Sequence, residues 1–135
     1  MPYMKYTIWV LLSVIYISTF GQNTHQPQKG HAYFGYHPLG RDTLYLTYSQ
    51  IEAAPFLRCD LGSIEEFYVM WTVYGGDAAT PILVKGNALP APVLSALRHN
   101  KNRRTTIYMG DIRLKEKDGL MRVLNPVTIE MASER

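Results

Sequence analysis

Alternating apolar and polar positions run through most of the chain after residue 30 and predict a mainly β protein. Runs rich in apolar, aromatic and β-branched residues predict strands at residues 33–36, 43–48, 64–74, 81–85, 105–114, 120–124 and 127–131. Turn signals separate these runs, and the strongest is Asp118-Gly119 in a hairpin. In the run at residues 105–114, Tyr108, Ile112 and Leu114 alternate with Met109, Asp111 and Arg113. Short strands at this spacing are typical of an immunoglobulin-like β-sandwich.

The strand at residues 64–74 is the longest of the set. One of its faces carries Phe67, Val69, Trp71 and Val73, and the other carries Tyr68, Met70, Thr72 and Tyr74. Because both faces are largely apolar, we expect a central strand, or a strand whose second face meets a partner.

Residues 90–102 interrupt the alternation and predict one short helix. Val93, Leu94 and Leu97 recur at helical spacing, and Pro90 and Pro92 suit a first helical turn. Basic side chains gather at the end of this helix, where they complement its dipole or dock an acidic partner: Arg98, Lys101, Arg103 and Arg104.

A single helical turn is also expected at residues 49–54. Ser49 would cap its N-terminus, and Pro55 would end it.

The N-terminal pattern predicts a secretory signal peptide at residues 1–21. Lys5 precedes an apolar run at residues 6–17, and small and polar residues follow up to Gly21. The alternative is a retained membrane anchor, but the fifteen residues 6–20 would span only about 22 Å as a helix, less than the hydrocarbon core of about 30 Å. The polar residues 22–30 would form a flexible lead-in. We therefore expect an exported protein, periplasmic or extracellular, that meets the membrane only through an uncleaved signal segment.

Composition and charge fit one small exported domain. The 135 residues carry a formal charge of +3, and removal of residues 1–21 takes away only Lys5, leaving 114 residues at +2. So small an excess of positive charge does not indicate a nucleic-acid partner. The single cysteine, Cys59, has no second cysteine with which to form an internal disulfide. Its apolar neighbours favour burial over a disulfide between two chains. A homodimer is the alternative that the sequence leaves open.

The sequence carries no recognisable motif for catalysis, metal binding or a cofactor. None of the four histidines, His25, His31, His37 and His99, has metal-site spacing. No nucleophile elbow or phosphate loop occurs, and the adjacent carboxylates Glu65 and Glu66 would point to opposite faces of a strand. We therefore expect a protein that is not an enzyme and holds no cofactor, with a hydrolase built from dispersed residues left as a third hypothesis.

Residues 105–131 carry a resemblance to a known family. The segment TTIYMGDIRLKEKDGLMRVLNPVTIEM combines an aromatic strand, Asp111-Ile112, a charged hairpin with Asp118-Gly119, Asn125-Pro126 and a last alternating strand. It resembles the C-terminal end of the gliding-motility GldM family, which includes the PorM components of type IX secretion. Similarity in order and pattern extends over residues 39–131, and the domain would occupy residues 31–132.

The resemblance implies an immunoglobulin-like β fold in the cell envelope of a Bacteroidetes-type bacterium. It also implies protein contacts instead of catalysis, with type IX secretion components as expected partners. The motor coupling of the full-length family is not expected here, because the chain is too short for the family's other periplasmic domains.

The leading hypothesis is an exported module that binds a protein partner. The candidate contact residues are Tyr68, Met70, Tyr74, Arg98, Lys101, Arg103 and Arg104. The alternative is a domain that binds a small ligand or glycan through stacked tyrosines and Trp71.

Overall fold

The computed structural model describes residues 32–40, 42–77 and 79–134. The expected signal peptide at residues 1–21 and lead-in at residues 22–30 lie outside the described residues. Two helices are present, α2 (Tyr48–Ala53) and α3 (Ala91–His99). The strands are β1 (Ala32–Phe34), β2 (His37–Pro38), β3 (Leu44–Thr47), β4 (Leu57–Cys59), β5 (Gly62–Val73), β6 (Ile82–Lys85), β7 (Thr105–Glu116), β8 (Met121–Leu124) and β9 (Val127–Ala132).

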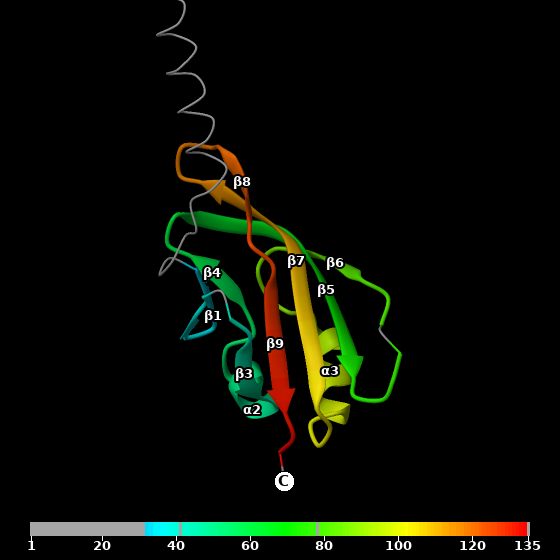
Figure 1. The fold of residues 1–135 in the computed structure, drawn as a ribbon. Helices are drawn as coiled ribbons and strands as arrows, with labels where there is room; N and C mark the ends of the chain where they lie inside the picture. Colours follow the sequence, from blue (N-terminus) through cyan, green and yellow to red (C-terminus); the bar gives the residue numbers. More distant parts are fainter. Residues whose placement is uncertain (1–31, 41, 78, 135) are drawn as a thin grey trace, which may run out of the picture.

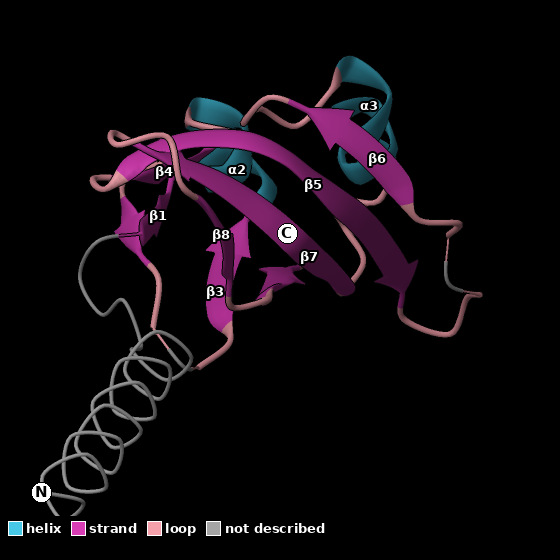
Figure 2. Ribbon diagram, turned by 90° about the horizontal axis from the view of Figure 1, so that it is seen from above, coloured by secondary structure: helices cyan, strands magenta, loops and turns pink. Residues whose placement is uncertain are grey.

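The described strands join into a single mixed sheet. Its order is β2-β1-β4-β5-β7-β9-β3, with β6 added to β5 and β8 added to β7. Every pair is antiparallel except β3 with β9. The sheet curls into a half-barrel, and both helices lie on the same side of β5 and β7 (Figures 1 and 2).

The mainly β class is confirmed, but the structure differs from the expected two-layer sandwich with one helix. The twelve-residue strands β5 and β7 pair along their length, from Gly62 with Glu116 to Val73 with Thr105. This continuous pair holds the strands in one sheet, and helices close the inner side that a second sheet would cover.

Among the described residues, no helix has both the length and the apolar character that a membrane span requires.

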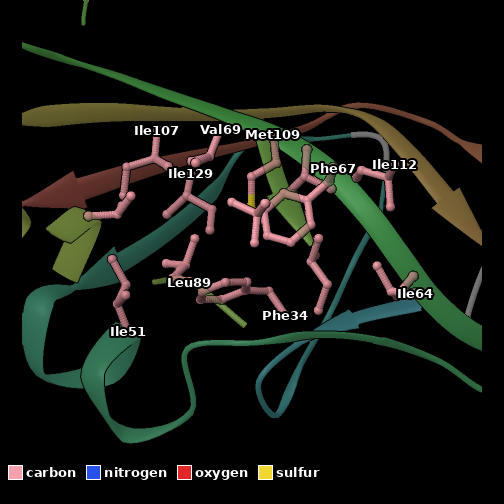
Figure 3. Close-up of a cluster of buried hydrophobic side chains, with 14 of the residues drawn as sticks. Phe34, Ile51, Ile64, Phe67, Val69, Leu89, Ile107, Met109, Ile112 and Ile129 are labelled. Atoms are coloured by element: carbon pink, nitrogen blue, oxygen red, sulfur yellow. The ribbon is translucent and has the colours of Figure 1, made fainter. Parts of the chain in front are cut away.

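The hydrophobic core fills the space between the inner face of the sheet and the elements that cover it. Sheet side chains such as Phe67, Met109 and Ile129 face Ile51 from α2 and Phe34 from β1 (Figure 3). The helix α3 adds Val93 and Leu97, as its apolar spacing predicts. Cys59 is also buried, as expected.

Two bulges exchange the inner and outer positions along β5 and β7. On β5, Ile64 and Glu66 pair with the adjacent residues Leu114 and Arg113, so β5 contains one extra residue there. On β7, the extra residue lies between Gly110 and Arg113. Each bulge moves the alternation by one position.

The bulge on β7 overturns one grouping made from the sequence. Uniform alternation placed Tyr108 on the same face as Ile112 and Leu114. In the structure Tyr108 is 39% exposed, whereas Ile112 and Leu114 are buried. Asp111 absorbs the change with a left-handed backbone, at φ 48°.

The first helix, α2, is capped two residues earlier than expected. Thr47, and not Ser49, is the N-cap of α2. The Gln50 backbone N–H donates to Thr47 Oγ1 at 3.3 Å, and the Thr47 backbone N–H donates to Gln50 Oε1 at 2.9 Å. This capping box satisfies two N–H groups at the helix start.

Candidate functional site

The outer face of the sheet carries a shallow hollow of about 290 Å³ between β5 and β7. We call it the tyrosine hollow, and it is lined by Tyr68, Val69, Met70, Pro81, Tyr108, Gly110 and Asp111. Tyr68 lies at its centre, paired with Leu83 of β6 on one side and with Gly110 of β7 on the other. Tyr68 and Leu83 are 42% and 41% exposed.

Gly110 gives the hollow its shape. A Cβ atom at this position would lie 2.7 Å from Cε1 of Tyr108, closer than side chains pack. Glycine therefore leaves room for the Tyr108 side chain to extend over position 110, directly opposite Tyr68. The neighbouring Asp111 holds the strained left-handed conformation that bends β7 at this point.

Ion pairs border the hollow at one end. Glu66 accepts a hydrogen bond from Lys85 Nζ at 2.6 Å and lies 3.7 Å from Arg113 Nε. Arg113 in turn lies 3.5 Å from the Asp111 carboxylate. The Lys85 hydrogen bond holds the pKa of Glu66 below its usual value. This end of the hollow therefore carries charged side chains, and the carboxylates of Glu66 and Asp111 each have a cation beside them.

A second ion pair lies towards the other end of the same face. Arg104 Nε donates to Glu130 Oε1 at 2.6 Å, and the Thr106 hydroxyl donates to Glu130 Oε2 at 3.1 Å. The bond to Glu130 raises the pKa of Arg104. The tyrosine hollow is thus a mainly apolar and aromatic strip with one charged side chain in its lining, Asp111, and with ion pairs towards both of its ends.

The predicted contact residues fall into two separate groups. Tyr68 and Met70 line the tyrosine hollow. Tyr74 lies beyond the end of β5, about 20 Å along the strand from Tyr68, and is 80% exposed. Its backbone N–H donates to the Arg104 carbonyl at 2.8 Å. Tyr74 therefore lies beside the loop after α3 that carries Lys101, Arg103 and Arg104, which we call the basic loop.

The basic residues lie at the end of α3 and in the loop that follows. All four are exposed, and Arg104 is held by Glu130. The described part of the chain provides no ion pair for Arg98, Lys101 or Arg103. This loop is therefore a basic surface, but it is separate from the tyrosine hollow.

Sequence reasoning missed Tyr108, Gly110 and Leu83. Leu83 and Gly110 are the neighbours of Tyr68 across two strand pairs, so they are recognisable only when the register is known. The Gly-Asp pair at positions 110 and 111 was an available signal, because glycine inside a strand pattern indicates a bulge or a close approach.

Trp71 does not belong to the tyrosine hollow. It packs partly buried against the core, on the inner face of β5, whereas Tyr68 and Met70 lie on the outer face. The single aromatic platform of tyrosines and Trp71 that the glycan hypothesis required is therefore not formed.

The described residues contain no cluster of three histidine, cysteine or carboxylate side chains that could hold a metal ion. Among them, every buried side-chain nitrogen or oxygen also has a hydrogen-bond partner. The absence of catalysis and of a cofactor stays a prediction.

Comparisons with known proteins gave no match. No protein-family model matches the chain, and neither a curated protein nor a solved structure does. The resemblance to the GldM family stays a prediction, based on residues 105–131.

Proposed function

We propose that the chain is an exported, non-enzymatic module that binds a protein partner of the cell envelope through the tyrosine hollow. The observation that carries the proposal is an aromatic centre with ion pairs towards both ends, on a face that keeps Tyr68 and Tyr108 about 40% exposed. Protein interfaces are organised in this way, with aromatic anchors at the centre and polar groups at the rim.

The position of the hollow favours binding with little loss of conformational freedom. Its tyrosines lie on β5 and β7, the two longest strands, which are paired to each other along their length. Tyrosine offers a large contact area with few rotatable bonds, so a ring held on a rigid strand loses little entropy on binding.

The resemblance to GldM supplies the proposed partner class. Components of a type IX secretion machine are the partners we propose, and Arg98 together with Lys101 and Arg103 of the basic loop would assist docking to an acidic surface. We propose the described sheet as a distant variant of the immunoglobulin-like sandwich that the same resemblance implies.

The test is affinity capture from the bacterium's own envelope, with the tagged protein recovered after export. The double variant Tyr68→Thr with Met70→Thr keeps strand-forming residues but removes the aromatic and thioether groups. We expect a loss of at least tenfold in recovered partner. Tyr36→Thr is the matched control, because Tyr36 is 74% exposed in the turn between β1 and β2.

Equal capture by the wild-type protein and the double variant would overturn the proposal. Thermal unfolding of each variant separates lost binding from lost folding. If the double variant unfolds, Leu83→Thr provides the same test at an exposed position beside Tyr68. Saccharide binding with no protein capture would instead favour the glycan alternative.

A further inference from the structure

The strand β8 forms a free edge of the sheet. It pairs with β7 through residues 112–115, and no other described strand pairs with it. Figure 1 shows the β7–β8 hairpin at the end of the sheet away from the helices. An edge strand of this kind presents unpaired backbone groups to any extended segment that reaches it.

The turn before β8 decides which backbone groups point outward. Glu116 N–H donates to the Leu120 carbonyl at 2.8 Å, and Gly119 N–H donates to the Glu116 carbonyl at 2.9 Å. Hydrogen-bonded pairs alternate along an antiparallel ladder, so Arg122 and Leu124 bond to β7. The N–H and C=O groups of Met121 and Val123 therefore point to the free edge.

The side chains at this edge are apolar and exposed. Leu120 is 63% exposed, Met121 57% and Val123 62%. Met121 and Val123 share one face of the strand, because they are two residues apart. Arg122 lies on the opposite face, where its Nη2 is 2.7 Å from Glu116 Oε1. Met121 and Val123 thus expose two apolar side chains on one face of an edge strand, and Leu120 exposes a third in the turn just before it. Exposed apolar side chains on a free edge strand favour pairing with another chain.

We propose that two copies of this chain associate by pairing β8 with β8 in antiparallel orientation, across a two-fold axis at Arg122. Met121 then lies opposite Val123 of the second copy, and Val123 lies opposite Met121 of the second copy. Each of these pairs exchanges two backbone hydrogen bonds, so four backbone hydrogen bonds link the two copies of β8. The two sheets become one continuous sheet.

A second copy suits this edge because the pattern is the same from either direction. The order apolar, arginine, apolar places apolar side chains together on one face across the axis. On the other face, each Arg122 brings its own Glu116 carboxylate, so the paired edges carry no net charge there. Closed two-fold symmetry of this kind requires the same patch on both subunits.

The contact is small, and we expect a transient dimer. Two four-residue strands bury less surface than the roughly 1,200 Å² typical of the smallest stable complexes. A dissociation constant of about 10–100 µM is the expected range. The edge lies outside the tyrosine hollow, so dimerisation does not depend on the proposed docking function.

The test is sedimentation velocity of the exported protein at concentrations from about 1 to 500 µM, chosen to span that range. Val123→Pro is the diagnostic variant, because the Val123 N–H bonds to no acceptor in β7 and proline is tolerated at such edge positions. We expect self-association to weaken at least tenfold while the thermal unfolding midpoint stays close to that of the wild type. The Tyr68→Thr with Met70→Thr variant should dimerise like the wild type.

Three results would overturn the proposal. They are a monomer at the highest concentration, equal dimerisation by Val123→Pro, and a dimer that reductant dissolves, which would point to Cys59. If the proline variant fails to fold, Val123→Lys adds a charge at the same exposed position. That variant should be monomeric, and its dimerisation would equally contradict the proposal.

Discussion

Tyr68 and Gly110 lie directly opposite each other on β5 and β7, and the Tyr108 ring occupies the space that a side chain at position 110 would fill. The missing side chain and the two tyrosines together form the tyrosine hollow. The hollow therefore depends on one glycine as much as on the aromatic residues.

Gly110→Ala should move the Tyr108 ring without unfolding the domain. The added Cβ would meet the ring at 2.7 Å, and a side-chain ring gives way more easily than backbone does. We expect a destabilisation of about 1 kcal/mol and a severalfold loss of partner capture, measured by urea unfolding and by affinity capture. Gly40→Ala is the control, because nothing lies within 4 Å of its Cβ position. Unchanged capture would show that the ring position is irrelevant to docking.

The strained residue Asp111 provides a prediction on stability. Its φ of 48° favours glycine, is tolerated by asparagine and is unfavourable for β-branched residues. We expect Asp111→Gly to be neutral or stabilising by up to about 1 kcal/mol. Asp111→Val should be destabilising by about 1–3 kcal/mol. Asp111→Asn is the near-isosteric control, and equal urea midpoints for the glycine and valine variants would contradict the bulge.

The cap of α2 can be tested by alanine substitution. Thr47→Ala removes the hydroxyl that accepts from the Gln50 N–H and should cost about 1 kcal/mol. Ser49→Ala leaves the capping box intact and should cost less. Chemical denaturation of both variants decides between the two caps, and a larger loss at Ser49 would restore the assignment made from the sequence.

Glu134 links the end of the chain to the start of α2, and this contact makes stability depend on pH. Its Oε1 accepts from the Ser49 backbone N–H at 2.8 Å, and this bond lowers the pKa of Glu134 from its ordinary value of 4.5. The stabilising contribution is therefore present above the unfolded-state pKa and is lost as the pH falls through the folded-state pKa.

Glu134→Gln should therefore be less stable than the wild type at pH 7, and the difference should shrink in more acidic solution. Urea unfolding at a series of pH values from about 7 to 3 measures this convergence. A difference that does not change with pH would show that the charge of Glu134 has no part in the contact.

Local patterns predicted much of the secondary structure. Asp118-Gly119 marks its hairpin because Gly119, at φ 90°, adopts a backbone that glycine favours. The helix α3 follows from Val93 and Leu97, which recur at helical spacing and are buried. The length and two apolar faces of the strand at residues 64–74 indicated the central β5, which pairs with β4, β6 and β7.

The remaining features depend on contacts between segments far apart in the sequence. The bulges on β5 and β7 shift the alternation in ways that a uniform period of two does not reveal. The parallel pairing of Leu44 with Ile129 joins distant segments and leaves no local signal. The bulge on β7 is the reason that Tyr108 was assigned to the wrong face, and the tyrosine hollow was therefore not predicted.

The measurement that tests the central claim most directly is site-specific photo-crosslinking in living cells. A photoreactive amino acid would replace Tyr68 or Tyr108 in the tyrosine hollow, Arg103 in the basic loop and, as the control, Tyr36. We predict that both hollow positions crosslink to the same envelope protein, and that Tyr36 gives no such product. Crosslinks from Tyr36 or Arg103 in the absence of any from the hollow would contradict the proposal that this face binds the partner.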